Sequence, residues 1–72
     1  MENKQLFNKY KNLMQRKHSL EVRQFKLGQH LANNPTDYVS VVANELLLSD
    51  IYRNDYKLKE TLKRMELSSY AQ

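Results

Sequence analysis

The residue types that most often carry out chemistry are few in this chain, and their spacing does not bring them together. His18 precedes Ser19, but consecutive side chains on a helix point apart, so this pair is not a nucleophile with its base. His18 and His30 are twelve residues apart and do not share a helix face at a spacing that suits metal ligands. We therefore interpret both histidines as solvated helix residues.

The acidic residues and the glycine content argue against the other common kinds of site. Glu45, Asp50 and Asp55 follow one another at intervals of five, which does not stack them on one helix face, and the glycine-punctuated loop of a calcium site is missing. With Gly28 as its only glycine, the chain has no glycine-rich phosphate loop. With no cysteine, it has neither a disulfide nor a thiolate metal site. The sequence predicts no enzyme, no metal and no cofactor.

Length and composition predict one small helical domain over residues 1–72. The chain is 40% hydrophobic and 28% charged, has no apolar run long enough to span a bilayer, and does not begin with a secretory signal. We expect a cytoplasmic protein. A chain this short buries a small core, and without disulfides or metals the expected source of extra stability is a partner chain, identical or not.

The first half of the chain has the pattern of a long amphipathic helix. Leu6, Leu13, Leu20 and Leu27 repeat every seven residues. Four residues after each of them come Tyr10, Lys17, Gln24 and Leu31. This is an a/d seam with two polar members, typical of a helix that packs along another helix. The sequence predicts a helix over about residues 4–33.

The stretch LANNPTDYV, residues 31–39, holds the only proline and predicts the end of that helix. Proline disfavours helical geometry in the preceding residue, here Asn34. We expect a turn at residues 33–35, with Asn34 as the N-cap of a second helix, Pro35 at its first position and Asp37 at its third. Such a short connection joins antiparallel neighbours.

The second helix is predicted over about residues 35–68. Its early part, from Tyr38 to Tyr52, is apolar around nearly its whole circumference, and a two-helix hairpin cannot bury all of it. Later Ile51, Leu58 and Met65 repeat by seven, with Asp55 and Leu62 expected at the intervening seam positions. The β-branched VSVV stretch could also form a strand, but no second strand is available to pair with it.

The predicted fold is therefore an all-α, antiparallel two-helix hairpin, completed by oligomerisation or by a partner. Folding at residue 34 places residue 13 near 55, and Lys17 within reach of Asp50 or Asp55, a pair that would fix register. The apolar residues left outside the two seams predict a partner-binding surface in the half nearest the turn. Its members are Val22, Phe25, Ala32, Val41, Leu48, Tyr52 and Tyr56.

The charge distribution allows a second hypothesis. The net charge is +4, with the excess in the first half of the chain, which permits contact with nucleic acid. Such binding would use the cations of the first helix, with Phe7 and Tyr10 to stack on bases. Those cations are Lys4, Lys9, Lys11, Arg16, Lys17 and Arg23. The helices are too long, and the turn unsuited, for a helix-turn-helix reader.

Residues 31–60 resemble a known family. The stretch LANNPTDY, followed by LLLSDIYRN and a lysine-rich helix, resembles the small needle-forming subunits of bacterial type III secretion systems, which are helical hairpins. Residues 35–37 match that family's turn. Residues 48–49 and 52–54 match its later Leu-Ser and Tyr-Arg-Asn stretch.

The sequence departs from the needle subunits in four ways. Tyr38 stands where a second proline would be, and the interval from the turn to YRN is shorter. The C-terminal stretch is charged, and the first helix is longer and more basic than in a needle subunit. These features are more similar to the small hairpin co-chaperones of the same systems, which bind a larger helical-repeat chaperone. The resemblance implies a non-enzymatic protein–protein interaction module, a secretion co-chaperone or needle-like component. The alternative is a small basic nucleic-acid-binding regulator.

Overall fold

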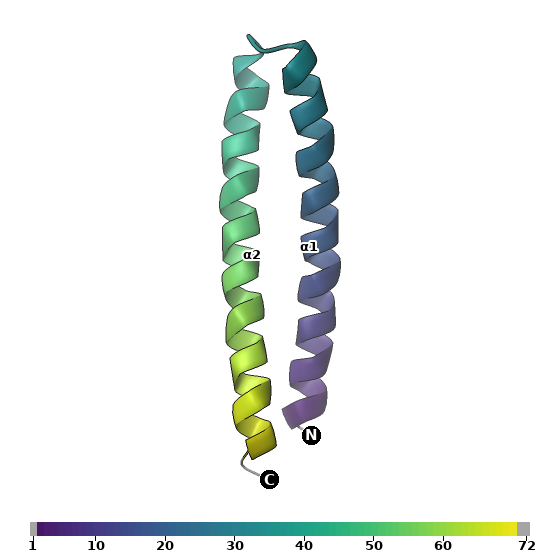
Figure 1. The fold of residues 1–72 in the computed structure, drawn as a ribbon, viewed down its shortest axis with the longest axis vertical. Helices are drawn as coiled ribbons and strands as arrows, with labels where there is room; N and C mark the ends of the chain where they lie inside the picture. Colours follow the sequence, from purple (N-terminus) through teal and green to yellow (C-terminus); the bar gives the residue numbers. More distant parts are fainter. Residues whose placement is uncertain (1, 71–72) are drawn as a thin grey trace.

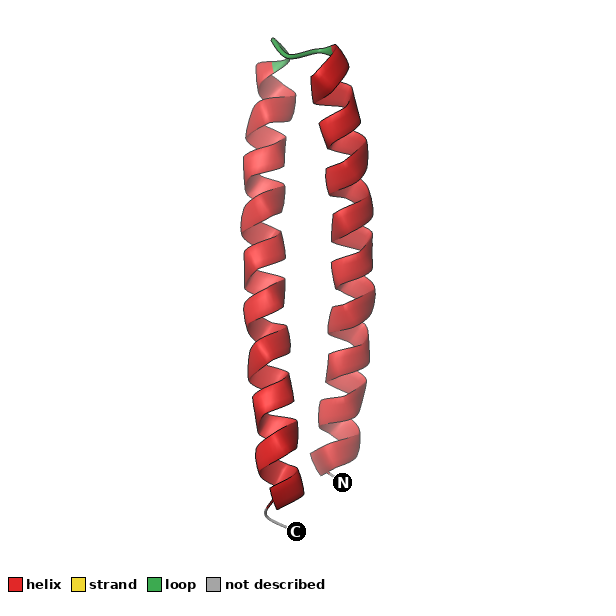
Figure 2. Ribbon diagram, viewed as in Figure 1, coloured by secondary structure: helices red, strands yellow, loops and turns green. Residues whose placement is uncertain are grey.

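The protein folds as a hairpin of two long helices. The structure, a computed structural model, describes residues 2–70, and the side chains of residues 4–67. Helix α1 spans Glu2–Asn33 and α2 spans Tyr38–Tyr70, and the two lie side by side with both ends of the chain opposite the turn (Figure 1). No strand occurs within residues 2–70, so the expectation of an all-α antiparallel hairpin is confirmed (Figure 2). The rod measures 55 × 15 × 13 Å.

The turn at residues 34–37 closes α1 with two consecutive asparagines. The backbone nitrogen and Nδ2 of Asn34 both donate to the carbonyl oxygen of His30, at 2.9 and 3.0 Å, and Asn33 Nδ2 donates to the Gln29 carbonyl at 3.2 Å. The two bonds from Asn34 use the His30 carbonyl, the first of the last four carbonyls of α1, which the end of a helix leaves without an intrahelical partner. The Asp37 nitrogen then donates to the Asn34 carbonyl at 3.1 Å, which closes a β-turn with Pro35 at its second position, where proline's fixed φ fits.

The start of α2 corrects the expected N-cap. The sequence placed the cap at Asn34 and the helix from Pro35, but α2 begins at Tyr38 and Asp37 caps it. The Asp37 carboxylate accepts from the Ser40 backbone nitrogen at 3.2 Å and from Ser40 Oγ at 2.7 Å, and the Asp37 carbonyl accepts from the Val41 nitrogen at 3.1 Å. Asn34 and Asp37 are both residue types that are favoured at the N-cap. Asn34 cannot serve here because its side chain closes α1.

The seam of α1 is the one that the sequence predicts. Leu6 and Leu20 are buried, and the other six predicted seam positions are half-buried. Those six are Tyr10, Leu13, Lys17, Gln24, Leu27 and Leu31. Every residue between them on α1, from Lys4 to Asn33, is exposed. A regular 3.5-residue spacing of the apolar positions was sufficient to identify this face.

The seam of α2 differs from the prediction at two positions. Leu47 and Leu58 are buried and Ile51 and Met65 are half-buried, as their spacing suggests. Between them, however, the buried residues are Asn54 and Thr61, at 2% and 1% exposure, not Asp55 and Leu62. Leu62 is 42% exposed. The seam steps by three and then four residues from Ile51, so the predicted intervening positions were late by one residue.

The pairing of the helices follows from one contact between them. Asn54 Nδ2 donates to the carbonyl oxygen of Leu13 at 3.0 Å. Because the helices run antiparallel with equal rise, residues of α1 and α2 whose numbers sum to about 67 lie at the same height along the rod. Leu20 then lies level with Leu47, and Leu6 with Thr61. This register is within one residue of the predicted one.

Candidate functional site

The hairpin has two flanks, one on each side of the seam. On α1, residues 7, 14, 21 and 28 follow the seam leucines by one position and so stack along one flank. On α2, residues 41, 48, 55 and 62 each follow a seam position by one residue, and they stack along the same flank. The opposite flank is formed by residues from both helices that line shared shallow grooves. Arg23 and Ala43 line one groove, Arg16 and Lys57 the next, and Lys9 and Arg64 the last.

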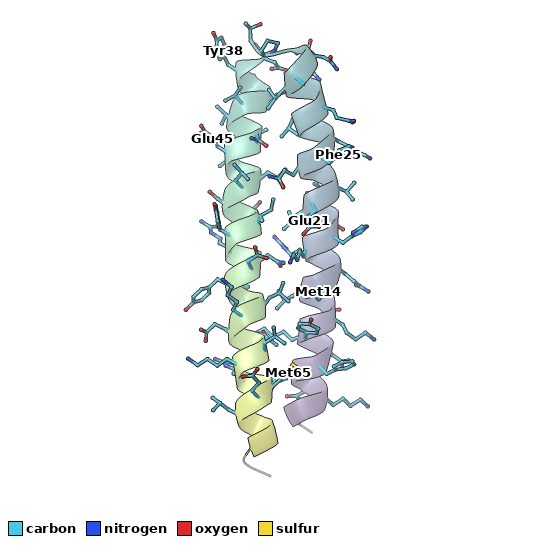
Figure 3. All side chains as sticks on the ribbon, viewed as in Figure 1. Met14, Glu21, Phe25, Tyr38, Glu45 and Met65 are labelled. Carbon is cyan, nitrogen blue, oxygen red and sulfur yellow. The ribbon has the colours of Figure 1, made fainter. Side chains whose placement is uncertain are left out.

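The first flank, which we call the apolar flank, carries large side chains in solvent from one end of the rod to the other. Two of them on α1, Met14 and Phe25, are labelled in Figure 3. The exposed members of the flank include Phe7 at 51%, Met14 at 41%, Phe25 at 67% and Tyr52 at 74%. The flank as we define it comprises Phe7, Met14, Phe25, Ala32, Val41, Leu48, Tyr52 and Leu62. A row of exposed apolar side chains of this kind makes the flank a candidate interaction surface.

Five of the seven residues predicted for partner binding share the apolar flank. They are Phe25, Ala32, Val41, Leu48 and Tyr52. The other two, Val22 and Tyr56, are exposed at 38% and 66% but lie on the sides of their helices that point away from the seam. The prediction missed Phe7, Met14 and Leu62, which extend the flank to the free ends of the rod. The heptad spacing of Phe7 and Met14 was the signal that could have identified them.

The outer surface of α2 near the turn is also apolar. Val39, Val42 and Leu46 are exposed there at 81%, 54% and 64%. Leu46 also lines a shallow groove on the other flank. The remaining lining residues come from both helices, and they are Arg23, Lys26, Leu27, His30, Ala43, Leu47 and Asp50. The sequence indicated an α2 that is apolar all round in this region, and the structure leaves that surface in solvent.

The second flank, which we call the basic flank, concentrates the positive charge. It carries seven lysines and arginines against Asp50 and Glu60. The seven are Lys9, Arg16, Arg23, Lys26, Arg53, Lys57 and Arg64. Its net charge of about +5 exceeds the +4 of the whole chain, so the rest of the molecule is close to neutral. None of the seven forms an ion pair among the side chains of residues 4–67.

The residues predicted for nucleic-acid contact divide among three surfaces. Lys9, Arg16 and Arg23 lie on the basic flank. Lys4 and Lys11 lie on the other side of α1, and the Lys11 ammonium stacks 5.7 Å from the centre of the Phe7 ring. Lys17 is half-buried in the seam and forms no ion pair with Asp50 or Asp55, so the pair expected to fix register is absent.

In place of the expected pair with Lys17, the polar contact between the helices is the hydrogen bond from Asn54 to Leu13. The Asn54 side chain is 2% exposed, and its Nδ2 bonds to α1, while its Oδ1 is buried without any hydrogen-bond partner. Thr61 is equally buried, but its Oγ1 donates to the Lys57 carbonyl of its own helix at 2.8 Å. A buried asparagine in a seam specifies alignment at a cost in stability.

The one ion pair among the described side chains lies at the turn. His30 Nε2 is 2.7 Å from Asp37 Oδ2, so the end of α1 is joined to the N-cap of α2. The hydrogen bond from His30, helped by those from Ser40, lowers the pKa of Asp37 from 3.8 to about 2. His30 is therefore part of the turn and not only a solvated helix residue. This arrangement joins the end of α1 to the start of α2, and the hydroxyl beside it, Ser40 Oγ, donates to the Asp37 carboxylate, as an N-cap contact, and not to His30.

Neither a metal site, a membrane-spanning helix nor a matching known protein is found for the described part of the chain. Among the described residues, no group of three or more histidines or carboxylates is placed to hold a metal ion. Neither α1 nor α2, as far as they are described, is long and apolar enough to cross a membrane. No protein family, curated protein or solved structure was found to match this chain. The two flanks are thus the candidate functional surfaces.

Proposed function

We propose that this chain is a non-enzymatic protein–protein interaction module that binds through its apolar flank. The observation that carries the proposal is the imbalance between core and surface. Among the side chains of residues 4–67, only four hydrophobic ones are buried, Leu6, Leu20, Leu47 and Leu58, whereas twelve large hydrophobic ones are exposed. A core of this size gives a small domain little stability, and burying the flank against another protein would supply more.

The finer form of the proposal is a type III secretion co-chaperone or needle-like component acting in the cytoplasm. It is supported by the resemblance over residues 31–60 and by the hairpin topology. In that role the partner is a helical-repeat chaperone or another hairpin of the same system. Stable co-purification with such a protein from the source cell would support it, and co-purification with no secretion component would count against it.

The test of the interaction module is a capture experiment with matched variants. Phe25→Asp puts a charge in the apolar flank, and Leu46→Asp makes the same change at a nearly equally exposed side chain on the other side of the rod. We expect wild type and Leu46→Asp to retain the same partner, and Phe25→Asp to lose it. Equal capture by all three proteins would refute binding through the apolar flank.

The basic flank supports a second candidate function, the binding of nucleic acid as a small regulatory protein. Along α1, Lys9, Arg16 and Arg23 are spaced by about 10.5 Å, because seven residues rise about 1.5 Å each. Lys57 and Arg53 face them from α2. Rows of unpaired cations of this kind bind phosphates and release counterions.

This second function predicts a steep dependence on salt. Affinity for duplex DNA should fall linearly with salt on logarithmic axes, and Arg16→Gln with Lys57→Gln should lower both the affinity and the slope. Lys4→Gln with Lys11→Gln removes the same charge from the other side of α1 and serves as the control. Binding that is unaffected by the first pair of changes, or absent at low salt, would exclude this function.

A further inference from the structure

The accessible surface of the hairpin is larger than a stable monomer of its mass requires. The chain exposes 6054 Å², whereas a compact monomer of 8.6 kDa exposes about 4,700 Å². The excess is roughly 1,350 Å², and a stable complex of standard size buries only about 800 Å² per partner. The apolar flank runs along the whole rod, so the occupant that would cover it is itself a rod of similar length.

We propose that the apolar flank is covered by a second copy of this chain, packed face to face with its turn over the free ends of the first, to give a four-helix bundle. The inference rests on the proposed function and names its partner. In this arrangement a two-fold axis crosses the rods at right angles near their middle. Each α1 then lies antiparallel to the α1 of the second copy, and each α2 to the second α2.

Charged residues alternate with the apolar ones on this flank, and their placement favours the arrangement. On α1, Lys11 lies four residues after Phe7, and Glu21 lies seven after Met14. On α2, Glu45 and Lys59 lie four residues after Val41 and Asp55. Lys11 and Glu21 are equally distant from position 16 of α1, which is close to the middle of Glu2–Asn33, so the axis brings each opposite the other in the second copy. On α2, Lys59 and Glu45 are equally distant from position 52, which lies near the same height. All four opposite-charge contacts therefore form at once. Electrostatic complementarity of this kind selects orientation and register.

The apolar residues match under the same axis. Phe7 and Phe25 also have position 16 as their midpoint, so each phenylalanine lies over the other. Leu62 and Val41 are related in the same way on α2. Asp55 is the acidic residue in the middle of the flank that finds no opposite charge, since it lies against Leu48.

The other two-fold arrangement, with both turns at the same end, is disfavoured by charge. It would set the α1 of one copy against the α2 of the other at equal heights. Glu21 would then lie within one residue of the level of Glu45, since their numbers sum to 66. Lys11 would lie within about three residues, or about 4.5 Å, of the level of Lys59, since their numbers sum to 70. Like charges in contact oppose association.

A charge-swap experiment tests the pairing. Within one chain, Lys11 and Glu21 are about 15 Å apart along α1 and cannot pair, so any rescue arises between molecules. We expect Lys11→Glu and Glu21→Lys each to weaken dimerisation by about tenfold in analytical ultracentrifugation, and the double variant to recover wild-type affinity. With both turns at one end, Glu21→Lys would instead tighten the dimer, which would overturn the proposed arrangement.

Single cysteines give an independent measurement, because the chain has none of its own. A mixture of Phe7→Cys and Phe25→Cys proteins should form the mixed disulfide in preference to either homodimer. Cross-linking of Phe7→Cys to Leu62→Cys in preference would indicate the other arrangement.

The variants of the flank complete the test. Phe25→Asp should weaken self-association by a hundredfold or more, and Leu46→Asp should leave it unchanged. A wild-type chain that is monomeric and helical at high micromolar concentration, and that stays so after 100-fold dilution, would overturn self-association. If that monomer still captured a different protein through Phe25, the interaction module would stand and only the second copy would be wrong.

Discussion

Asn54 offers a direct measurement of what a buried polar contact costs this hairpin. Its Oδ1 is buried without a partner, which costs about 1–3 kcal/mol, while the bond from Nδ2 to Leu13 returns about 0.5–1.5 kcal/mol. The Leu13 carbonyl lies within α1, where it also accepts the intrahelical bond expected from Lys17. Removing the asparagine therefore leaves no new unsatisfied group.

Replacing Asn54 by leucine should stabilise the protein. Loss of the unsatisfied oxygen, burial of an apolar side chain and a better helix former together outweigh the lost hydrogen bond, by about 2 kcal/mol after some overpacking. For a domain of this size, that corresponds to a rise in Tm of roughly 10 °C. Urea unfolding followed by circular dichroism, at one fixed protein concentration, measures the change.

The opposite change at the same position provides the control. Asn54→Asp puts a carboxylate against the Leu13 carbonyl with no donor to satisfy it, and should destabilise the fold by about 3 kcal/mol or more at pH 7. A lower urea midpoint for Asn54→Leu than for wild type would refute the reasoning, because it would mean that the buried Oδ1 has a stabilising partner.

Three further predictions follow from other parts of the hairpin. Gly28→Ala should stabilise α1 by about 1 kcal/mol in thermal unfolding, because Gly28 lies inside the helix with φ negative and an added Cβ meets no atom within 4 Å. Leu20→Ala should destabilise by about 2–5 kcal/mol, since Leu20 is 4% exposed, and dilute samples should lose most of their helical circular dichroism. His30→Ala should raise the pKa of Asp37 from about 2 toward 3.8 in a carboxyl NMR titration. A lowered pKa in the folded state adds stability above the unfolded value of 3.8 that is lost as the pH falls through about 2, so this variant should show a shallower loss of stability between pH 4 and 2.

The outcomes that would contradict these three predictions are specific. A destabilised Gly28→Ala would indicate that another chain approaches the α1 backbone at that position. A Leu20→Ala protein as stable as wild type would mean that burial of this seam leucine does not stabilise the hairpin. An unchanged Asp37 pKa in His30→Ala would leave the Ser40 bonds as the whole cause of its shift.

The sequence by itself determined the first helix and the place of the turn. All eight seam positions of α1 follow from its heptad spacing, because the seven-residue repeat of leucines selects one face, whereas the other large apolar residues of α1, such as Phe7 and Phe25, are not repeated along the whole helix. Pro35 determined where the first helix ends, because proline disfavours helical geometry in the residue before it, Asn34. The N-cap was left open, since Asn34 and Asp37 both satisfy the local preference. The contact of Asn34 with the end of α1 decided in favour of Asp37.

Only the tertiary structure decided which face of α2 is inside and what the two flanks carry. Apolar residues surround the first half of α2, so periodicity could not select one face, and the burial of Asn54 and Thr61 in place of Asp55 and Leu62 depends on contact with α1. The separation of an apolar flank from a basic one also combines residues from both helices. Which residues share a flank depends on the side that each helix turns toward the other, and a rotation of either helix about its own axis would mix the two surfaces. Side-chain packing between the helices fixes that orientation, and no local pattern contains it.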